Sequence, residues 1–306
     1  MNIILFSEAF DNWKKYLDLN LKPQSSKKVL NRFELHVLPY FKDKNIYDLN
    51  INDIILWKIN INNKNYKYKY KKAIFYSFVT FVNFCVIFYG LTKNVVSQSK
   101  CFKNTNDLKK EYNIWNYEEY KQFLSVIDDY KYYVLFDFMY STGCRLGETL
   151  ALTFDDLNND MITINKTITK EYINGSRLIT TPKTKKSNRM ILIDNELKLE
   201  ICKLKKYYKS RNINCKYIFG GDKPLSPTTI NRKKVKYCKL SKVKEIRIHD
   251  LRHSHATLLI NNNVPIEAVA NRLGHSDINL TYNTYIHNEL ENEKRVLNTL
   301  SLIKSI

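Results

Sequence analysis

Apolar residues at helical spacing run through residues 6–94, and this pattern limits most strongly what the chain can fold into. The opening segment carries large apolar side chains three or four positions apart: Phe6, Phe10, Trp13 and Leu17. That spacing places them on one face of a helix, where they can pack on other helices. This part of the chain therefore predicts a small helical domain.

Breaks in the pattern separate the expected helices. Residues 22–26 interrupt the first helix, and a second helix is expected through 29–37, stopping near Pro39. The pair Asn52-Asp53 is expected to cap a third. The most apolar stretch, 75–90, is too short and too often interrupted by polar residues to span a bilayer, so we expect a buried helix there.

A polar stretch without periodicity, residues 95–107, marks a domain boundary. We expect three parts: a helical domain over 1–98, a linker over 99–111, and a second domain over 112–306. The second domain has helical patterns on both sides of a segment rich in strand-forming residues, 161–193, in which Asn174-Gly175 is a hairpin-turn signal. The expected fold class is mainly α with a small antiparallel β-sheet (α+β).

The charge of the chain points to a polyanionic partner. Fifty Lys and Arg residues stand against thirty Asp and Glu residues, a formal net charge of +20. Nucleic acid and an anionic membrane surface both fit this balance, and solubility alone is a further interpretation. No targeting segment is recognised, and the six scattered cysteines lack metal-binding or redox spacing, so a cytoplasmic protein with reduced thiols is expected.

A run of alternating basic and aromatic residues, 65–72, leads into the apolar helix. Its lysines are Lys67, Lys69, Lys71 and Lys72. Such a run can bind DNA, with lysine charges and tyrosine hydroxyls directed at phosphate oxygens. The alternative is a solvated loop and helix start. DNA contact is the favoured interpretation, because the rest of the chain supports it.

Two segments of the second domain can place an arginine beside a phosphate. In residues 141–148, Arg145 lies between two glycines just after a helix, which can direct it into a cleft. In residues 249–253, His249 and Arg252 are neighbours on one face if a helix begins there. An ion pair between Arg145 and Glu148, or a capped helix with surface charges, would explain either segment without any chemistry.

A third segment, 273–287, adds a histidine and a tyrosine. A helix is expected to end at Gly274, so His275 lies just beyond it. Tyr285 follows ten positions later, with His287 two positions beyond.

Taken in this order, the three segments resemble the tyrosine recombinases, the phage-integrase family. The family pattern has an arginine in a TG-x-R-x-G-E context, then H-x-L-R-H, L-G-H and a tyrosine in Y-x-H, and all four occur here. The resemblance covers nearly the whole chain. It implies a core-site DNA-binding domain followed by a catalytic domain, which together form a C-shaped clamp, and no further arm-site domain is expected.

The resemblance implies roles for the matching residues. The family's catalytic residues fall on Arg145, Lys183, His249, Arg252, His275 and, as the nucleophile, Tyr285. Lys183 fits the family's sheet lysine best, with Lys185 and Lys186 as alternatives. Tyr282 competes with Tyr285, which is preferred because His287 follows it.

These residue types suit attack on a phosphodiester. Two guanidinium groups can stabilise the charge that grows on the phosphate oxygens, so no metal or other cofactor is expected. Lys183 is expected to protonate the 5′ oxygen as it leaves, and His249 to accept the proton of the tyrosine. The covalent phosphotyrosine keeps the bond energy, so religation needs no ATP.

Partners follow from the same resemblance. We expect recombination sites in double-stranded DNA, a homo-tetramer on that DNA, and an accessory directionality or DNA-bending factor, with the protein at the nucleoid and no membrane partner. The last helix, 288–306, docks on a neighbouring protomer or on its own domain. Competing hypotheses are a type IB topoisomerase, a hairpin telomere resolvase, or a DNA-binding protein that has lost catalysis.

Overall fold

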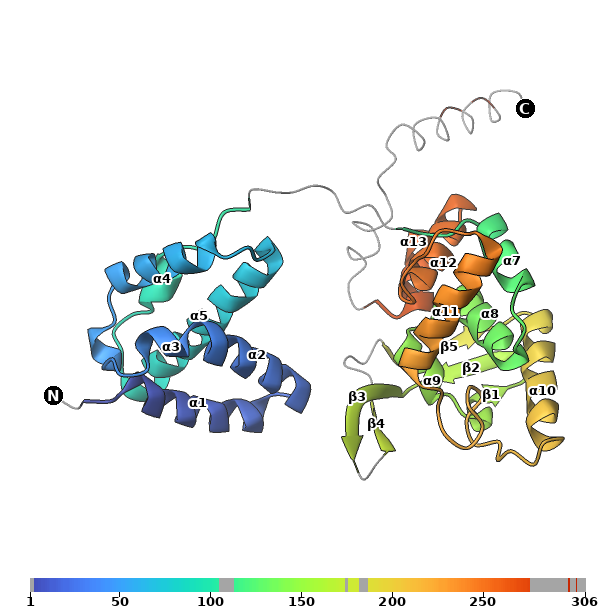
Figure 1. Cartoon of the computed structure of the whole chain (residues 1–306), viewed down its shortest axis with the longest axis horizontal. Coiled ribbons are helices and arrows are strands. Elements are labelled where there is room, and N and C mark those ends of the chain that lie inside the picture. Colours follow the sequence, from blue (N-terminus) through green and yellow to red (C-terminus); the bar gives the residue numbers. More distant parts are fainter. Residues whose placement is uncertain are drawn as a thin grey trace. The chain divides into compact units, whose positions relative to one another are not determined.

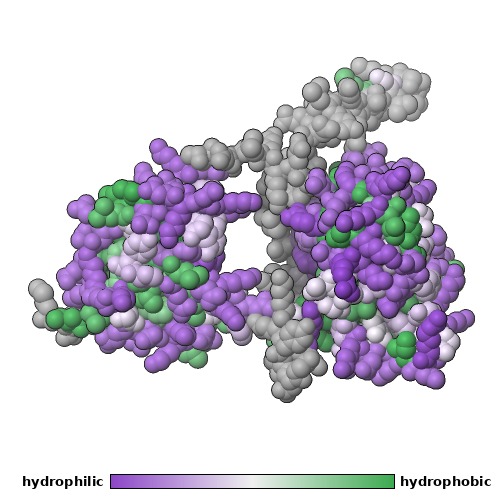
Figure 2. All heavy atoms as spheres, in the orientation of Figure 1, coloured by the Kyte–Doolittle hydropathy of each residue, from purple (hydrophilic) through white to green (hydrophobic). Residues whose placement is uncertain are grey.

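The computed structural model describes residues 3–104, 113–173, 176–181, 187–275, 297 and 301. By its internal contacts the chain divides into two compact units, residues 1–110 and 111–306. Figure 1 shows both units, and Figure 2 shows that hydrophilic residues cover most of the visible face of each.

The described part of the first unit is helical. Its elements are α1 (Phe6–Asn20), α2 (Pro23–His36), α3 (Leu38–Phe41), the 3-10 turn η1 (Ile46–Asp48), α4 (Ile51–Asn63), α5 (Tyr68–Tyr89) and α6 (Val95–Gln98). Aromatic rings form the centre of its core: the Phe6 ring lies 5.8 Å from Phe33 and 4.6 Å from Phe81, measured between centroids. The apolar face expected in the first helix is therefore buried against α2 and α5.

Helix α5 contains the most apolar stretch of the chain. Among the described residues it is the one helix long and apolar enough for a membrane span. Its Phe75, Phe78 and Phe81 side chains are buried in the core of the first unit. α5 is thus the buried helix that the sequence predicts.

Two details at helix ends in the first unit differ from the expectation. The second helix ends at His36, near Pro39 as expected, but Pro39 itself lies in the first turn of the short helix α3, because a proline needs no backbone N–H donor there. The cap of α4 is Asn50 and not Asn52. The Asn50 side chain accepts from the backbone of Asp53, whose carboxylate accepts from the Asn50 N–H in return.

The second unit is mainly helical with small antiparallel sheets, which confirms the expected class. Its helices are α7 (Tyr117–Ser125), α8 (Tyr130–Thr142), α9 (Leu146–Ala151), η2 (Phe154–Asp156), α10 (Asn195–Lys209), α11 (Pro227–Ser241), α12 (Asp250–Asn261) and α13 (Ile266–Leu273). α8 packs against α7, α10 and α12, so it forms the centre of the unit (Figure 1).

The strands form two sheets among the described residues, where a single sheet is expected. They are β1 (Leu157–Asn158), β2 (Met161–Ile164), β3 (Thr167–Ile173), β4 (Ser176–Thr180) and β5 (Arg189–Leu192). β5 returns to pair with β2, because Ile162 and Ile191 face each other in the core. β3 and β4 pair only with each other and form a hairpin that projects from the unit (Figure 1).

Candidate active site

A tight turn after α8 positions Arg145. Gly143 ends α8 with φ +67°, a conformation that favours glycine. A Cβ atom on it would lie 2.7 Å from the side chains of both His255 and Leu273, so the turn has no room for a side chain at this position. Arg145 is the N-cap residue of α9, and its side chain extends from this packed turn.

Glu148 binds both the side chain and the backbone of Arg145. The Arg145 guanidinium donates to Glu148 Oε1 at 2.7 Å, and the Arg145 backbone N–H donates to Oε2 at 3.0 Å. The Glu148 side chain is 4 % exposed, whereas that of Arg145 is 38 % exposed. The ion pair with Glu148, weighed as an alternative for Arg145, is thus present, yet Arg145 still extends toward solvent.

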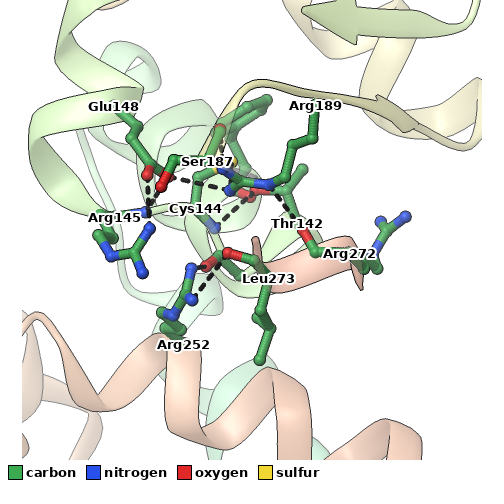
Figure 3. Close-up of polar contacts among 11 residues, drawn as sticks. Thr142, Cys144, Arg145, Glu148, Ser187, Arg189, Arg252, Arg272 and Leu273 are labelled. Atoms are coloured by element: carbon green, nitrogen blue, oxygen red, sulfur yellow. Dashed lines mark hydrogen bonds and ion pairs between the residues drawn. The ribbon is translucent and has the colours of Figure 1, made fainter. Parts of the chain in front are cut away.

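Arg252 reaches the same turn from α12 (Figure 3). It donates through Nη1 to the carbonyl of Gly143 at 2.9 Å and through Nη2 to that of Leu273 at 2.8 Å. These contacts use two of the five N–H groups of a guanidinium. Burial, followed by the nearby Arg145, lowers the pKa of Arg252 to about 10, so it stays charged at neutral pH.

His249 and His275 lie in the field of the same two arginines. His249 directly precedes α12, and His275 follows the α13 end, its backbone N–H donating to Ala270 at 3.0 Å. Burial first, then Arg252 and Arg145, lowers the pKa of His249. The same causes, in the same order, lower the pKa of His275 to about 4. Four sequence-predicted residues from three separate segments therefore meet at one place.

A further histidine, which motif matching left without a role, belongs to this cluster. The His253 ring lies 5.1 Å from that of His249, at 90° to it. Burial, with His249 beside it, lowers the pKa of His253 to about 4. It is the last residue of the H-x-L-R-H motif, so the signal was present in the sequence.

Two further arginines beside the site, Arg189 and Arg272, are not in the predicted set. Arg189, at the start of β5, donates to Glu148 at 2.9 Å and to the carbonyl of Arg272 at 2.8 Å. Arg272 donates to the carbonyls of Ser141 and Leu192 and to the ring of His255. Figure 3 shows the Arg189 guanidinium between Glu148 and the backbone of Arg272, beside the turn that carries Arg145.

Several predicted residues lie outside the described part of the chain. They are Lys183, Lys185, Lys186, Tyr282, Tyr285 and His287. The Asn174-Gly175 turn and the expected helix 288–306 also fall there, apart from residues 297 and 301. The roles of all these residues stay predictions.

The basic run lies at the start of α5. Lys67, Lys69 and Lys72 are exposed. Lys71 is partly buried, and its Nζ donates to the backbone carbonyl of Asn62 at 2.8 Å, at the end of α4. Three lysines of the run are therefore accessible to a phosphate, while Lys71 has a structural contact.

Comparison with known proteins places both units. The sequence matches the model of the phage integrase family over residues 113–292, and that of the phage integrase N-terminal SAM-like domain over residues 5–58. The ICEBs1 integrase of Bacillus subtilis strain 168 is 28 % identical over 283 residues, which covers 88 % of this chain and 75 % of that protein.

Solved structures share the fold. The Tn1549 transposon integrase in complex with transposon right end DNA superposes with a TM-score of 0.78 at 19 % identity, over 97 % of this chain and 100 % of that one. A lambda integrase tetramer bound to a Holliday junction gives a TM-score of 0.68 at 15 % identity, over 93 % and 78 %. At such identities the likeness concerns the fold.

Proposed function

The chain belongs to the phage integrase family of site-specific recombinases, and we propose that it breaks and rejoins DNA through a bond between Tyr285 and a backbone phosphate. The family membership makes it a tyrosine-type recombinase that acts in site-specific recombination of mobile elements or phage. The assignment of individual residues to steps of the reaction is our proposal.

One observation carries this assignment: the guanidinium groups of Arg145 and Arg252 meet at one turn. Together with Arg189 they place three positive charges around this turn, two of which, Arg145 and Arg189, are paired with the carboxylate of Glu148. Such an excess of fixed positive charge suits a phosphate whose charge grows in the transition state. Arginine keeps its positive charge at any physiological pH and can donate two parallel hydrogen bonds to the phosphate oxygens.

The proposed cleavage step transfers one phosphoryl group and two protons. The Tyr285 oxygen bonds to phosphorus as the bond to the 5′ oxygen breaks. That oxygen takes a proton from Lys183, and the tyrosine proton passes to His249. The lowered pKa of His249, caused first by burial and then by Arg252, keeps it neutral at pH 7 and so able to accept a proton. Attack by a 5′ hydroxyl reverses the step and religates the strand.

Histidine 275 has a different proposed role. Burial and then Arg252 hold its pKa at about 4, so it is a neutral hydrogen-bond donor near the phosphate at pH 7. A neutral N–H can bind a non-bridging oxygen without releasing a proton to it. His275 therefore complements the two charged arginines.

Partners follow from the same proposal. DNA is the substrate, and we propose that four copies assemble on paired recombination sites, as the lambda integrase does on a Holliday junction. The first unit would bind the core site through its exposed lysines Lys67, Lys69 and Lys72, at the nucleoid, with an accessory factor setting direction.

Covalent capture can identify the DNA sequence that the protein cleaves. The protein is mixed with nicked duplexes that have a randomised core, so that the cleaved fragment diffuses away and the covalent adduct accumulates. Sequencing the captured strands defines a core duplex for all later work. Capture without sequence enrichment, together with relaxation of supercoiled plasmid, would favour a topoisomerase instead.

The arginine assignment is tested on that duplex. Arg145→Ala is expected to slow adduct formation by about 10²- to 10³-fold, the usual effect of losing one transition-state donor. Binding of the duplex is expected to change little, because many lysines hold its backbone. Arg145→Lys, which keeps the charge but not the fork, serves as the control. Equal losses of binding and cleavage would contradict a transition-state role.

A further inference from the structure

We propose that Arg189 is a positioning residue that keeps Arg145 available to the phosphate, by holding the Glu148 carboxylate away from a two-point contact with the Arg145 guanidinium. This inference rests on the proposed role of Arg145. Arg189 lies on β5, outside the set of residues assigned to the reaction.

The contacts of Glu148 divide between its two oxygens. Oε1 accepts from Arg145 Nη1 at 2.7 Å, while Oε2 accepts from Arg189 Nη2 at 2.9 Å and from the Arg145 backbone N–H at 3.0 Å. Arg145 thus binds Glu148 through one guanidinium nitrogen. An arginine and a carboxylate that have no other partners commonly form a bidentate pair with two parallel hydrogen bonds.

Arg189 itself is fixed from several directions. Its Nε donates to the carbonyl of Arg272 at 2.8 Å and its Nη1 to that of Ser187 at 3.1 Å. Its side chain is 6 % exposed. A guanidinium anchored to two backbone carbonyls cannot follow Glu148, so it holds the carboxylate in one orientation.

The charges lead to the same conclusion. Burial opposes ionisation of Glu148, but Arg189 and Arg145 outweigh it and lower the pKa of the carboxyl, so it is negative at neutral pH. That single charge is shared by two guanidinium groups. Without Arg189 the full negative charge would face Arg145 alone and reduce its attraction for a phosphate.

The anchors also connect separate parts of the site. Arg272 O lies two residues before Gly274, at the end of α13, and His275 follows that end. One buried side chain therefore links the turn of Arg145 to the end of α13, beside the proposed catalytic residue His275.

The experiment uses the core duplex selected by the unmodified protein and measures the single-turnover rate of adduct formation. Arg189→Met removes the charge and the donors at similar volume. We expect the rate to fall about 100-fold, as for loss of a transition-state donor, with less than about threefold change in duplex affinity. Ile191→Ala, a core truncation on the same strand, is the control for general loss of stability.

The second variant separates positioning from folding. If the unopposed Glu148 charge causes the defect, Glu148→Gln in the Arg189→Met background should restore the rate at least about tenfold, although it adds no packing. An Arg189→Met rate that equals that of Ile191→Ala at matched thermal stability would overturn the proposal. So would a double variant as slow as Arg189→Met or slower.

Hydrogen exchange gives a reading that does not depend on catalysis. Arg189→Met should speed amide exchange in residues 143–149 and 270–275, while Ile191→Ala should not do so selectively. Unchanged exchange there would contradict the positioning role even if no duplex were captured. Failure of the unmodified protein to capture any duplex would contradict the proposed function alone.

Discussion

At the scale of single residues, the site combines arginines that are always charged with histidines that are held neutral. Burial, followed by neighbouring charges, lowers the pKa values of His253 and His275 to about 4 and that of His255 to about 3. A bound phosphate would offset the positive field of the arginines. We therefore expect DNA binding to raise the pKa values of the histidines nearest the phosphate.

The buried His255 predicts how stability depends on pH. An unfolded histidine binds a proton near pH 6.5, whereas folded His255 does so only near pH 3. Its contribution is therefore complete above pH 6.5 and is lost as the pH falls, by up to about 1.4 kcal/mol per pH unit. Denaturant titrations from pH 7 to pH 5 should show this loss. His255→Gln, which keeps an acceptor for Arg272, should reduce the slope, and an unchanged slope would refute the assignment.

The sequence predicted the residues that motifs mark, but not those that support them. Arg145, His249, Arg252 and His275 were found because each has a defined context, and the structure brings them together. Arg189 and Arg272 were given no role, because their partners are mostly backbone carbonyls of distant segments. Every residue has a backbone carbonyl, so the sequence does not show which one accepts a hydrogen bond, and such contacts are identified only from the structure.

At the scale of elements, the junction between α8 and α9 decides the geometry of the site. Leu273 and His255 pack against Gly143, and Arg252 binds the Gly143 carbonyl. Three helices thus converge on one glycine. A side chain there would push apart the segments that carry the site.

Gly143→Ala should be costly for that reason. A non-glycine residue at φ +67° costs about 1 to 2 kcal/mol, and the two contacts at 2.7 Å add crowding within a packed core. We expect a total of about 2 to 4 kcal/mol in urea unfolding of the second unit. Gly90→Ala, measured in unfolding of the first unit, is the matched control, because Gly90 has φ +69° but nothing within 4 Å of its Cβ position. Equal losses in the two variants would show that crowding contributes nothing.

Element positions followed from periodicity more closely than element ends did. The apolar faces of α1 and α5 are buried where the sequence placed them. The short helix α3 and the cap at Asn50 were missed because proline and asparagine occur both inside and before a first turn. Sheet pairing was also missed, since β2 and β5 are separated by the β3–β4 hairpin.

At the scale of the whole molecule, the basic residues behind the net charge of +20 are not equally able to bind DNA. The lysines of the basic run share one segment, yet they differ in their partners. Lys67, Lys69 and Lys72 are exposed, whereas Lys71 caps the end of α4. Only free ammonium groups can displace counterions from DNA, so sequence position alone does not identify the phosphate contacts.

Salt dependence of binding distinguishes these lysines. Each phosphate contact contributes about −0.9 to the slope of log K against log salt concentration. Lys67→Gln, Lys69→Gln and Lys72→Gln should each reduce that slope by up to about 1. Lys71→Gln should leave it nearly unchanged and lower stability instead. Fluorescence anisotropy with a labelled duplex measures the slope, and urea unfolding measures the stability. Equal slopes for all four variants would contradict DNA contact by this run.

The most direct test of the central claim is to identify the residue that becomes joined to DNA. The unmodified protein is trapped on its captured duplex, digested, and the DNA-linked peptide is identified by mass spectrometry, with Tyr285→Phe and Tyr282→Phe in parallel. We expect phosphate on Tyr285, no adduct from Tyr285→Phe, and a normal adduct from Tyr282→Phe. An adduct that persists in Tyr285→Phe would contradict the claim.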